Sequence, residues 1–387
     1  MKRLAIFLLP LFLLCGCRDG HWAGTGGFPK PKYSDSQLSE GLKSPKSEKL
    51  DAVSALVAQT LEAVRAEKLP ERLPNWIAYH AVLIFGPDSY QVWRNGNADE
   101  NLSRVFSVML RSETNAEGAF VLREGKPWPR HSGSYFSQEH HPDQFLNYFS
   151  MTGGTLDAKI SIDGRQFTMR DLLDRSFLES KADQELDYTV LAYSHYLEPG
   201  ISWTDKFGET VSFPELLKVL LTKDEPTCLG THRLGALART LSRETLCRTP
   251  EMKKLLPELE RQVRTAVYDL KSAQRPDGCF AIPGETPCSN SADFADIYFT
   301  GHSLEWILFL GDRFAADDWI VDAVESLAVK VLSNYELIYR NLDAVGSPGS
   351  HYDFDGLSHA VSALSRWRKI IEEGKSPANH TAVFISE

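Results

Sequence analysis

The stretch from Lys271 to Leu310 constrains the fold more than any other part of the chain. It reads as the end of a long charged helix, then a loop rich in glycine, proline and cysteine, then a largely apolar helix. The letters at 274–280 form a Gln-x-x-Asp-Gly-x-Phe turn. In such a turn glycine can adopt a backbone angle barred to other residues, and glutamine can bond helix-end backbone groups. The stretch predicts two helices joined by a structured turn, which is one unit of a helical barrel.

Helical periodicity recurs along most of the chain. Apolar residues at helical spacing predict helices at Leu50–Glu67, Trp76–Phe85, Met169–Leu178, Gln184–Tyr196, Phe213–Leu221, Thr231–Leu246, Pro250–Ser272, Asp293–Leu310, Asp318–Tyr339 and Phe354–Glu373. Consecutive helices with short loops pack antiparallel. The segment 250–272 is charged whereas 294–310 is apolar nearly all round, as an outer and an inner ring require. We therefore expect one mainly α domain over residues 50–373.

The segment 86–167 follows a different pattern. Short alternating runs at Ser89–Trp93 and Ala119–Leu122 lie between glycine, asparagine and proline signals, which is typical of strands and turns. Lys159–Phe167 places an Asp-Gly pair between alternating residues, the best hairpin signal in the chain. We expect a small irregular or β-containing insertion here, over one end of the helical barrel.

Two known families share parts of these signals. The 274–280 turn and the helical rhythm of 187–369 resemble the terpenoid cyclase and protein prenyltransferase superfamily, whose α/α-toroids repeat a Gln-x-x-x-Gly-x-Trp/Phe turn between helices. The segment Gly301-His302-Ser303-Leu304-Glu305-Trp306 resembles the Gly-His-x-x-Glu-Trp segment of the N-acylglucosamine epimerases, which are also α/α-barrels. The first resemblance implies an α/α-toroid fold, and the second implies proton transfer by His302.

The ends of the chain and its charge indicate where it works. Residues 1–17 carry Lys2 and Arg3 before an apolar run, as export signals do, and the letters Leu-Cys-Gly-Cys at 14–17 resemble the bacterial lipobox, which implies a lipid on Cys17. Residues 18–49 predict a flexible tether and 374–387 a disordered tail. The net charge of −10, without a basic run in the folded part, argues against nucleic acid as partner. We expect a lipoprotein anchored in the bacterial cell envelope, facing the periplasm or the exterior.

Three apolar helices each carry one histidine, namely His232, His302 and His359. They are spaced about one helical hairpin apart, so in a ring of parallel inner helices the three imidazoles can converge. Glu305 lies one turn after His302 and can fix its tautomer. These four residues are the candidates for general acid/base catalysis in a central cavity. The alternative interpretation is that each histidine only hydrogen-bonds inside a crowded helix bundle.

Cysteines and carboxylates suggest a metal site as a further alternative. Asp277-Gly278-Cys279 matches in letters the Asp-x-Cys pair that binds zinc in protein prenyltransferases, and this resemblance implies His359 as third ligand. The competing ligand trio is Cys228, His232 and His302. Cys279 shares a loop with Cys288, so a disulfide between them is equally compatible with the sequence.

The functional expectation is a cavity that binds a neutral lipid-like or saccharide ligand, with acid/base catalysis as an option. The enzymatic alternative is a sugar epimerase or polysaccharide lyase, and the non-enzymatic alternative is an interaction scaffold. Arginines distinguish the ligand classes, because Arg233 or Arg239 in the cavity would favour anionic sugars. Close convergence of the histidines would argue against the scaffold, because buried polar groups destabilise a fold unless they are paired.

Overall fold

The computed structural model describes residues 47–71, 73, 75–110, 119–129, 141–180, 184–222, 230–280, 292–343 and 348–374. The predicted leader 1–17 with Cys17, the tether up to residue 46 and the tail from residue 375 lie outside the described residues. Cys228 and Cys288 also lie outside them. No helix among the described residues is both long and apolar enough to cross a membrane.

The chain is mainly helical. Its helices are α2 (Ser47–Ala66), α3 (Asn75–Phe85), α4 (Ser89–Arg94), α5 (Glu100–Met109), α6 (Gln144–Met151), α7 (Met169–Glu179), α8 (Asp187–Tyr196), α9 (Phe213–Thr222), α10 (Thr231–Ser242), α11 (Glu244–Cys247), α12 (Pro250–Ser272), α13 (Ala292–Ile307), the 3₁₀ turn η2 (Leu308–Leu310), α14 (Asp312–Ala315), α15 (Asp318–Asp343) and α16 (Pro348–Gly374). The helix prediction is confirmed within a few residues for most of these elements.

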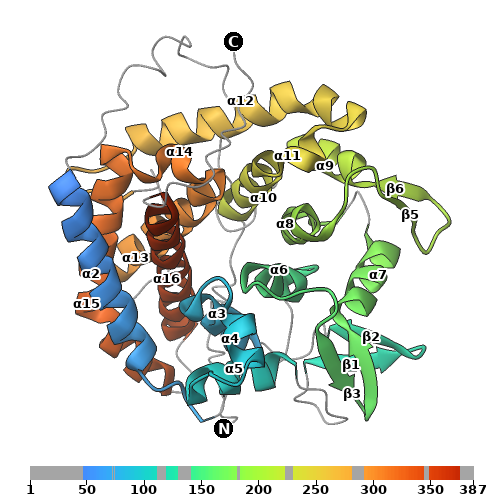
Figure 1. Ribbon diagram of the computed structural model, residues 1–387, viewed down its shortest axis with the longest axis horizontal. Helices are drawn as coiled ribbons and strands as arrows, with labels where there is room; N and C mark the ends of the chain where they lie inside the picture. The colour runs from blue at the N-terminus through green and yellow to red at the C-terminus, as the bar shows by residue number, and fades with distance from the viewer. Residues whose placement is uncertain are drawn as a thin grey trace, which may run out of the picture.

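Six helices contact one another in a closed cycle around the centre of the molecule. Following the contacts, α3 packs on α6, α6 on α8, α8 on α10, α10 on α13, α13 on α16, and α16 returns to α3. The helices α2, α15 and α12, together with α9, α7 and α5, lie outside this cycle (Figure 1). The difference follows from polarity. Nearly all side chains of α13 are buried, whereas α12 buries a single stripe and exposes its charged residues.

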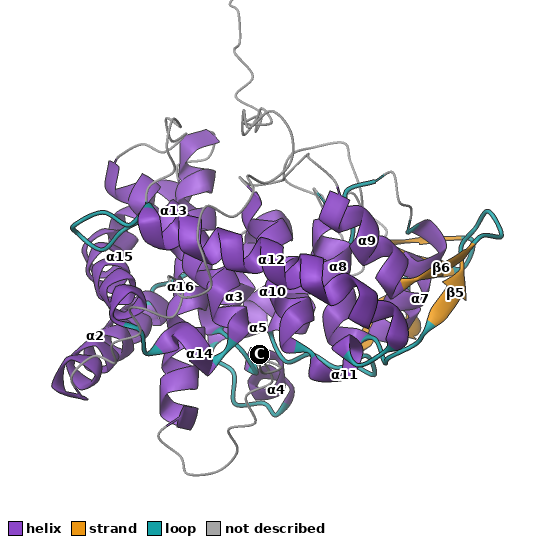
Figure 2. Cartoon of the chain, turned by 90° about the horizontal axis from the view of Figure 1, so that it is seen from above, coloured by secondary structure: helices purple, strands orange, loops and turns teal. Residues whose placement is uncertain are grey.

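Strands form three separate antiparallel hairpins. They pair β1 (Phe120–Arg123) with β2 (Lys126–Pro129), β3 (Lys159–Ile162) with β4 (Arg165–Thr168), and β5 (Ser202–Thr204) with β6 (Thr210–Ser212). All three lie at one side of the molecule (Figure 2). The hairpin predicted at Lys159–Phe167 is confirmed, and Ala119–Leu122 falls largely in β1.

Two expectations about the non-helical part are wrong. The run Ser89–Trp93 is helical as α4, because Tyr90 and Trp93 pack together against the ring of Phe106 on α5 and so need one helical face. The third hairpin, β5–β6, lies outside the predicted insertion. Its loop holds Asp205, whose carboxylate accepts backbone N–H bonds from Phe207 and Glu209, a local turn device that hydrophobic periodicity does not reveal.

The turn at 274–280 has the structure that its letters predict. The Gln274 amide donates to the carbonyl oxygens of Gly278 and Trp319, at 2.9 and 2.7 Å. Gly278 has a φ of +88°, and a Cβ atom there would lie 2.6 Å from the carbonyl oxygen of Asp322. Glycine is therefore needed both for the backbone angle and for the contact with α15.

Candidate functional site

The structure brings the three inner-helix histidines together at the centre of the helical cycle. His232 comes from α10, His302 from α13 and His359 from α16. The ring centroids of His302 and His359 are 3.9 Å apart, and the ring of His232 is 5.7 Å from each of them. One ring nitrogen from each lies within 4.8 Å of the other two. All three side chains are buried.

Two glycines allow α13 and α16 to approach closely enough for this contact. A Cβ atom on Gly301 would lie 2.8 Å from the Cα atom of Ala360, and one on Gly356 would lie 2.9 Å from the Cα atom of Tyr298. Any larger residue at these positions would push the two helices apart. The glycine before His302 thus fixes the distance between the imidazoles of His302 and His359.

We call the group formed by His80, His232, His302, Glu305, Asp355 and His359 the centre. Two of its histidines have a defined tautomer. The Nδ1 atom of His302 lies 2.9 Å from the carbonyl oxygen of Tyr298, and the Nδ1 atom of His80 lies 2.7 Å from that of Trp76. A carbonyl oxygen only accepts, so each Nδ1 must carry a proton. In the neutral ring the Nε2 atom then keeps its lone pair, and both Nε2 atoms belong to groups of side chains able to hold a metal ion.

His359 lies between two carboxylates. Its Nδ1 atom is 2.6 Å from Glu305 Oε2, and its Nε2 atom is 3.3 Å from Asp355 Oδ1. The same Asp355 oxygen lies 3.0 Å from His80 Nε2. The bond to Glu305 is well formed, whereas Asp355 Oδ1 and His359 Nε2 are close but not aligned for a hydrogen bond.

The centre contains an unusual concentration of buried polar atoms without a hydrogen bond. Among the described residues these are His232 Nδ1, His302 Nε2, His359 Nε2, Asp355 Oδ1 and Glu305 Oε1. Each such atom destabilises a fold by about 1–3 kcal/mol when it has no partner. These five groups are able to bond a metal ion or a water molecule.

The electrostatics of the centre are set by burial and by mutual contact. Burial opposes the charge on His359, but Glu305 and Asp355 prevail and raise its pKa to about 10. Burial, together with the charge of His359, lowers the pKa of His302 to about 4. Burial and the other imidazoles likewise lower the pKa of His232 well below its usual range. His359 is therefore the group that favours the charged form, whereas His232 and His302 favour the neutral form.

A chain of hydroxyl groups connects the histidines. The Tyr148 hydroxyl lies 3.0 Å from His80 Nε2 and 3.3 Å from the Tyr188 hydroxyl, which lies 3.3 Å from His232 Nε2. The sequence analysis did not identify Tyr148, Tyr188 or Asp355 as candidates. Asp355 had one usable signal, since it precedes His359 by four residues and so shares its helix face.

The space between these side chains is small. A water-sized sphere can occupy about 20 Å³ of the cavity lined by the three histidines, Glu305 and the apolar residues Met151, Leu191, Trp306 and Phe309. This is about enough for one water molecule. A sugar ring does not fit among the described residues in this arrangement, whereas an ion or a water molecule does.

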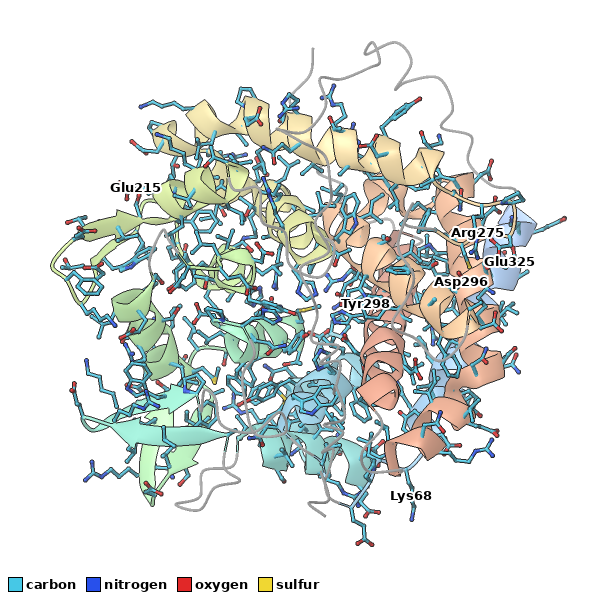
Figure 3. The ribbon with its side chains drawn as sticks, turned by 180° about the vertical axis from the view of Figure 1, so that it is seen from behind. Lys68, Glu215, Arg275, Asp296, Tyr298 and Glu325 are labelled. Carbon is cyan, nitrogen blue, oxygen red and sulfur yellow. The ribbon has the colours of Figure 1, made fainter. Side chains whose placement is uncertain are left out.

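A second group of potential ligands, which we call the rim cluster, consists of Asp277, Cys279 and Asp296. Arg275 bonds both carboxylates, at 2.8 Å to Asp277 and 2.5 Å to Asp296, and Lys330 lies 3.1 Å from Asp296. The Cys279 thiol is free, lies 3.0 Å from Ser326 Oγ, and has a pKa raised by burial. Arg275 and Asp296 lie near the rim of the molecule, and Tyr298 lies nearer its centre (Figure 3).

The structure therefore separates the residues that the sequence joined into metal sites. His359 belongs to the centre and not to the group formed by Asp277 and Cys279. His232 and His302 do lie together, but their proposed partner Cys228 is outside the described residues, and His359 takes the third place.

Comparison with known proteins leaves this centre as the main guide to function. No protein-family model matches the chain, and no curated protein matches it.

Proposed function

We propose that this chain is a metal-dependent enzyme in which His232, His302 and His359 hold one divalent ion that activates a water molecule for hydrolysis. One observation carries the proposal: unpartnered nitrogens of three buried imidazoles converge, while the outer nitrogens of His302 and His359 are held by an oxygen acceptor. Histidine ligands of metals have this arrangement, because the outer hydrogen bond fixes the tautomer and orients the ring.

The donor set selects the ion. Imidazole nitrogens suit zinc, copper, iron and nickel, whereas calcium and magnesium prefer oxygen ligands. Three protein ligands with a free fourth position are typical of catalytic zinc sites, in which the ion lowers the pKa of bound water to about 7. Zinc is therefore the first candidate, and the space for about one water supports a water-activating site.

Two carboxylates have different proposed roles in this site, positioning of a ligand and acceptance of a proton. Glu305 bonds the outer nitrogen of His359 and acts as a positioning residue. Asp355 Oδ1, without a hydrogen bond and 3.3 Å from His359 Nε2, is a carboxylate that would be able to accept a proton from a water at the ion. The Tyr148 and Tyr188 hydroxyls provide a route for protons between His80 and His232.

The proposal also includes the fold of the chain and its location in the cell. The closed cycle of six helices, with further helices outside it, supports an α/α-toroid whose inner ring carries the centre. We further propose that the protein is an envelope lipoprotein attached through Cys17, on the strength of the leader at residues 1–17. The toroid would then reach the membrane through the segment that precedes α2.

Metal-free acid/base catalysis is the second candidate, because one observation favours it. His359 between two carboxylates, with His302 beside it, is an arrangement able to move protons, as a sugar epimerase or lyase requires. The small cavity counts against a sugar substrate. An inert scaffold is supported least, because five unpartnered buried polar atoms only destabilise a protein that has no ligand for them.

Metal analysis tests the proposal directly. The full chain, purified in mild detergent without chelator, should contain about one equivalent of metal, and cobalt substitution should give the intense visible bands of a four-coordinate site. Removing the metal should lower the melting temperature, because an ion that binds only the folded state stabilises it. A protein that carries no metal and binds neither zinc nor cobalt would leave metal-free acid/base catalysis as the better explanation.

A further inference from the structure

A second group of side chains able to hold a metal ion shares His359 with the three-histidine group. It consists of His80 on α3 with Asp355 and His359 on α16, and one ligand atom from each lies within 4.8 Å of the other two. Asp355 precedes His359 by one helical turn, so the two share a face of α16. The packing of α3 on α16 brings His80 to this face. We call the group of His232, His302 and His359 the first position, and the group of His80, Asp355 and His359 the second position.

The spacing of the atoms in the second position fits the ligands of a metal ion. Asp355 Oδ1 lies 3.0 Å from His80 Nε2 and 3.3 Å from His359 Nε2. Nitrogen and oxygen ligands about 2.0–2.2 Å from one ion lie roughly 3.0–3.5 Å from their neighbours in octahedral or tetrahedral geometry. An ion occupies only the gap among its ligand atoms, so the second position does not depend on a cavity of the size that a substrate needs.

The orientation of these atoms also favours an ion over hydrogen bonds. Asp355 Oδ1 has no hydrogen-bond partner, although two imidazole nitrogens lie close to it. The Nδ1 atom of His80 carries a proton for the Trp76 carbonyl, so in the neutral ring its Nε2 atom has a lone pair 3.0 Å from this oxygen. A lone pair and a carboxylate oxygen repel each other unless a cation lies between them. Close contacts without alignment are expected where such atoms point to one ion.

The Tyr148 hydroxyl is the hydrogen-bond partner of His80 Nε2, and an ion would have to displace it. This hydroxyl has another partner at hand, because the Tyr188 hydroxyl lies 3.3 Å away. Burial raises the pKa of Tyr148 well above its usual value, so the group remains a neutral hydroxyl that can donate in either direction. Displacement by an ion therefore leaves Tyr148 with a hydrogen bond.

We propose that the second position binds a second divalent ion through His80 Nε2 and Asp355 Oδ1, and that Asp355 bridges it to the ion of the first position. His359 Nε2 serves the first ion, so the second ion has fewer protein ligands and binds more weakly. This inference rests on the proposed function, and the proton-accepting role of Asp355 belongs to the protein with a single ion. Paired ions stabilise both the attacking and the leaving oxygen of a hydrolytic displacement.

Stepwise loading of the metal-free full chain with cobalt tests the inference on the unmodified protein. The first equivalent should give the paramagnetic resonance of an isolated ion. The second should bind more weakly and reduce the resonance per cobalt ion, because ions bridged by a carboxylate couple magnetically. A wild type that binds a single equivalent would overturn the inference. A second equivalent without coupling would overturn it as well, since an ion in the rim cluster shares no ligand with the first position.

Two variants locate the second ion. His80→Phe removes the ligand nitrogen but keeps an aromatic ring beside Trp76 and Tyr148. It should bind the first cobalt ion as the wild type does, and its affinity for the second should fall by at least about hundredfold, since even loss of an outer partner costs ten- to hundredfold. Asp355→Asn, which has the same size, should also lose the second ion and decides the matter if His80→Phe does not fold. The control is His195→Gln on α8, outside the centre, which should bind two coupled ions.

The results separate the two proposals. If His302→Ala still binds one cobalt ion and the double variant with His80→Phe binds none, the second position stands without the first. If the wild type binds one ion that His302→Ala loses and His80→Phe keeps, the proposed function stands and the second position is refuted. A second, coupled ion that persists in His80→Phe and in Asp355→Asn would contradict the ligand assignment. Protein that binds no cobalt at all would refute both proposals.

Discussion

The centre and the rim cluster both gather potential metal ligands, histidines with carboxylates in the centre and carboxylates with one thiol at the rim, but their charges are balanced differently. In the rim cluster Arg275 and Lys330 neutralise Asp277 and Asp296 directly. In the centre no lysine or arginine takes this place among the described residues, and five buried nitrogens and oxygens have no hydrogen bond. The comparison teaches that ligand residue types alone do not indicate a metal site. Groups left without an internal partner do.

Removing one imidazole should have the largest effect on the difference between the two clusters. His302→Ala leaves two ring nitrogens at the ion, so the affinity for zinc should fall by at least about hundredfold, since even loss of an outer partner costs ten- to hundredfold. Competition with a chromophoric chelator measures the affinity. Cys279→Ser, in the rim cluster, should keep wild-type affinity. The opposite result for the two variants would move the metal to the rim.

Glu305→Gln tests the role of the hydrogen bond between Glu305 and the outer nitrogen of His359. The amide cannot carry the negative charge that Glu305 presents to His359 Nδ1, so zinc affinity should fall by about ten- to hundredfold. The matched control is Glu325→Gln, because Glu325 is a half-exposed carboxylate on α15. If Glu305→Gln binds zinc as tightly as the wild type, Glu305 does not position a ligand.

In the rim cluster the corresponding change affects stability rather than metal binding. Arg275→Met leaves the buried Asp296 with Lys330 alone, and the free energy of unfolding should fall by about 1–2 kcal/mol, as measured by urea denaturation. Arg340→Met, at an exposed ion pair on α15, should change it little. Zinc affinity should remain unchanged in both variants. A loss of zinc affinity in Arg275→Met would contradict the separation of the two clusters.

The smallest expected effect is a pH dependence of the rim cluster. Arg275 lowers the pKa of Asp277, mainly by hydrogen bonding. A carboxyl whose pKa is depressed in the folded state adds stability above its unfolded pKa of about 3.9 and loses it as the pH falls through the folded value. The stability difference between wild type and Arg275→Met should therefore shrink below about pH 4. A constant difference between pH 6 and pH 3 would show that ion pairing does not stabilise the cluster.

Much of the helical framework could be predicted because its signals are local. The bounds of α12 were predicted to the residue, since Thr249 caps a proline start and a charged stripe continues to Ser272. The 274–280 turn was equally predictable from its glycine and glutamine. The helix α4 was missed, because its six residues are too few to separate helical from strand periodicity.

The candidate site was predictable only in part. The spacing of His232, His302 and His359, each about one helical hairpin plus loops from the next, indicated their convergence, because each lies on an apolar helix. Tyr148 and Asp355 carried no comparable signal, since they look like ordinary members of helix interiors until α6 and α16 pack side by side with α3. The ligand set that contained Asp277 and Cys279 was predicted from a short sequence motif. Such a motif does not show that the side chain of Arg275 bonds Asp277.

By itself the sequence determined which segments are helices, which of them are apolar on all sides, and that three of these apolar helices each carry one histidine. These properties depend on neighbours within a few turns of the chain. Only the tertiary structure decided which charges are neutralised. Gly301 and Gly356 let two helices approach, and Arg275 bonds the rim carboxylates. Pairing of charges depends on distances of a few ångströms between segments far apart in sequence, and local periodicity does not encode those distances.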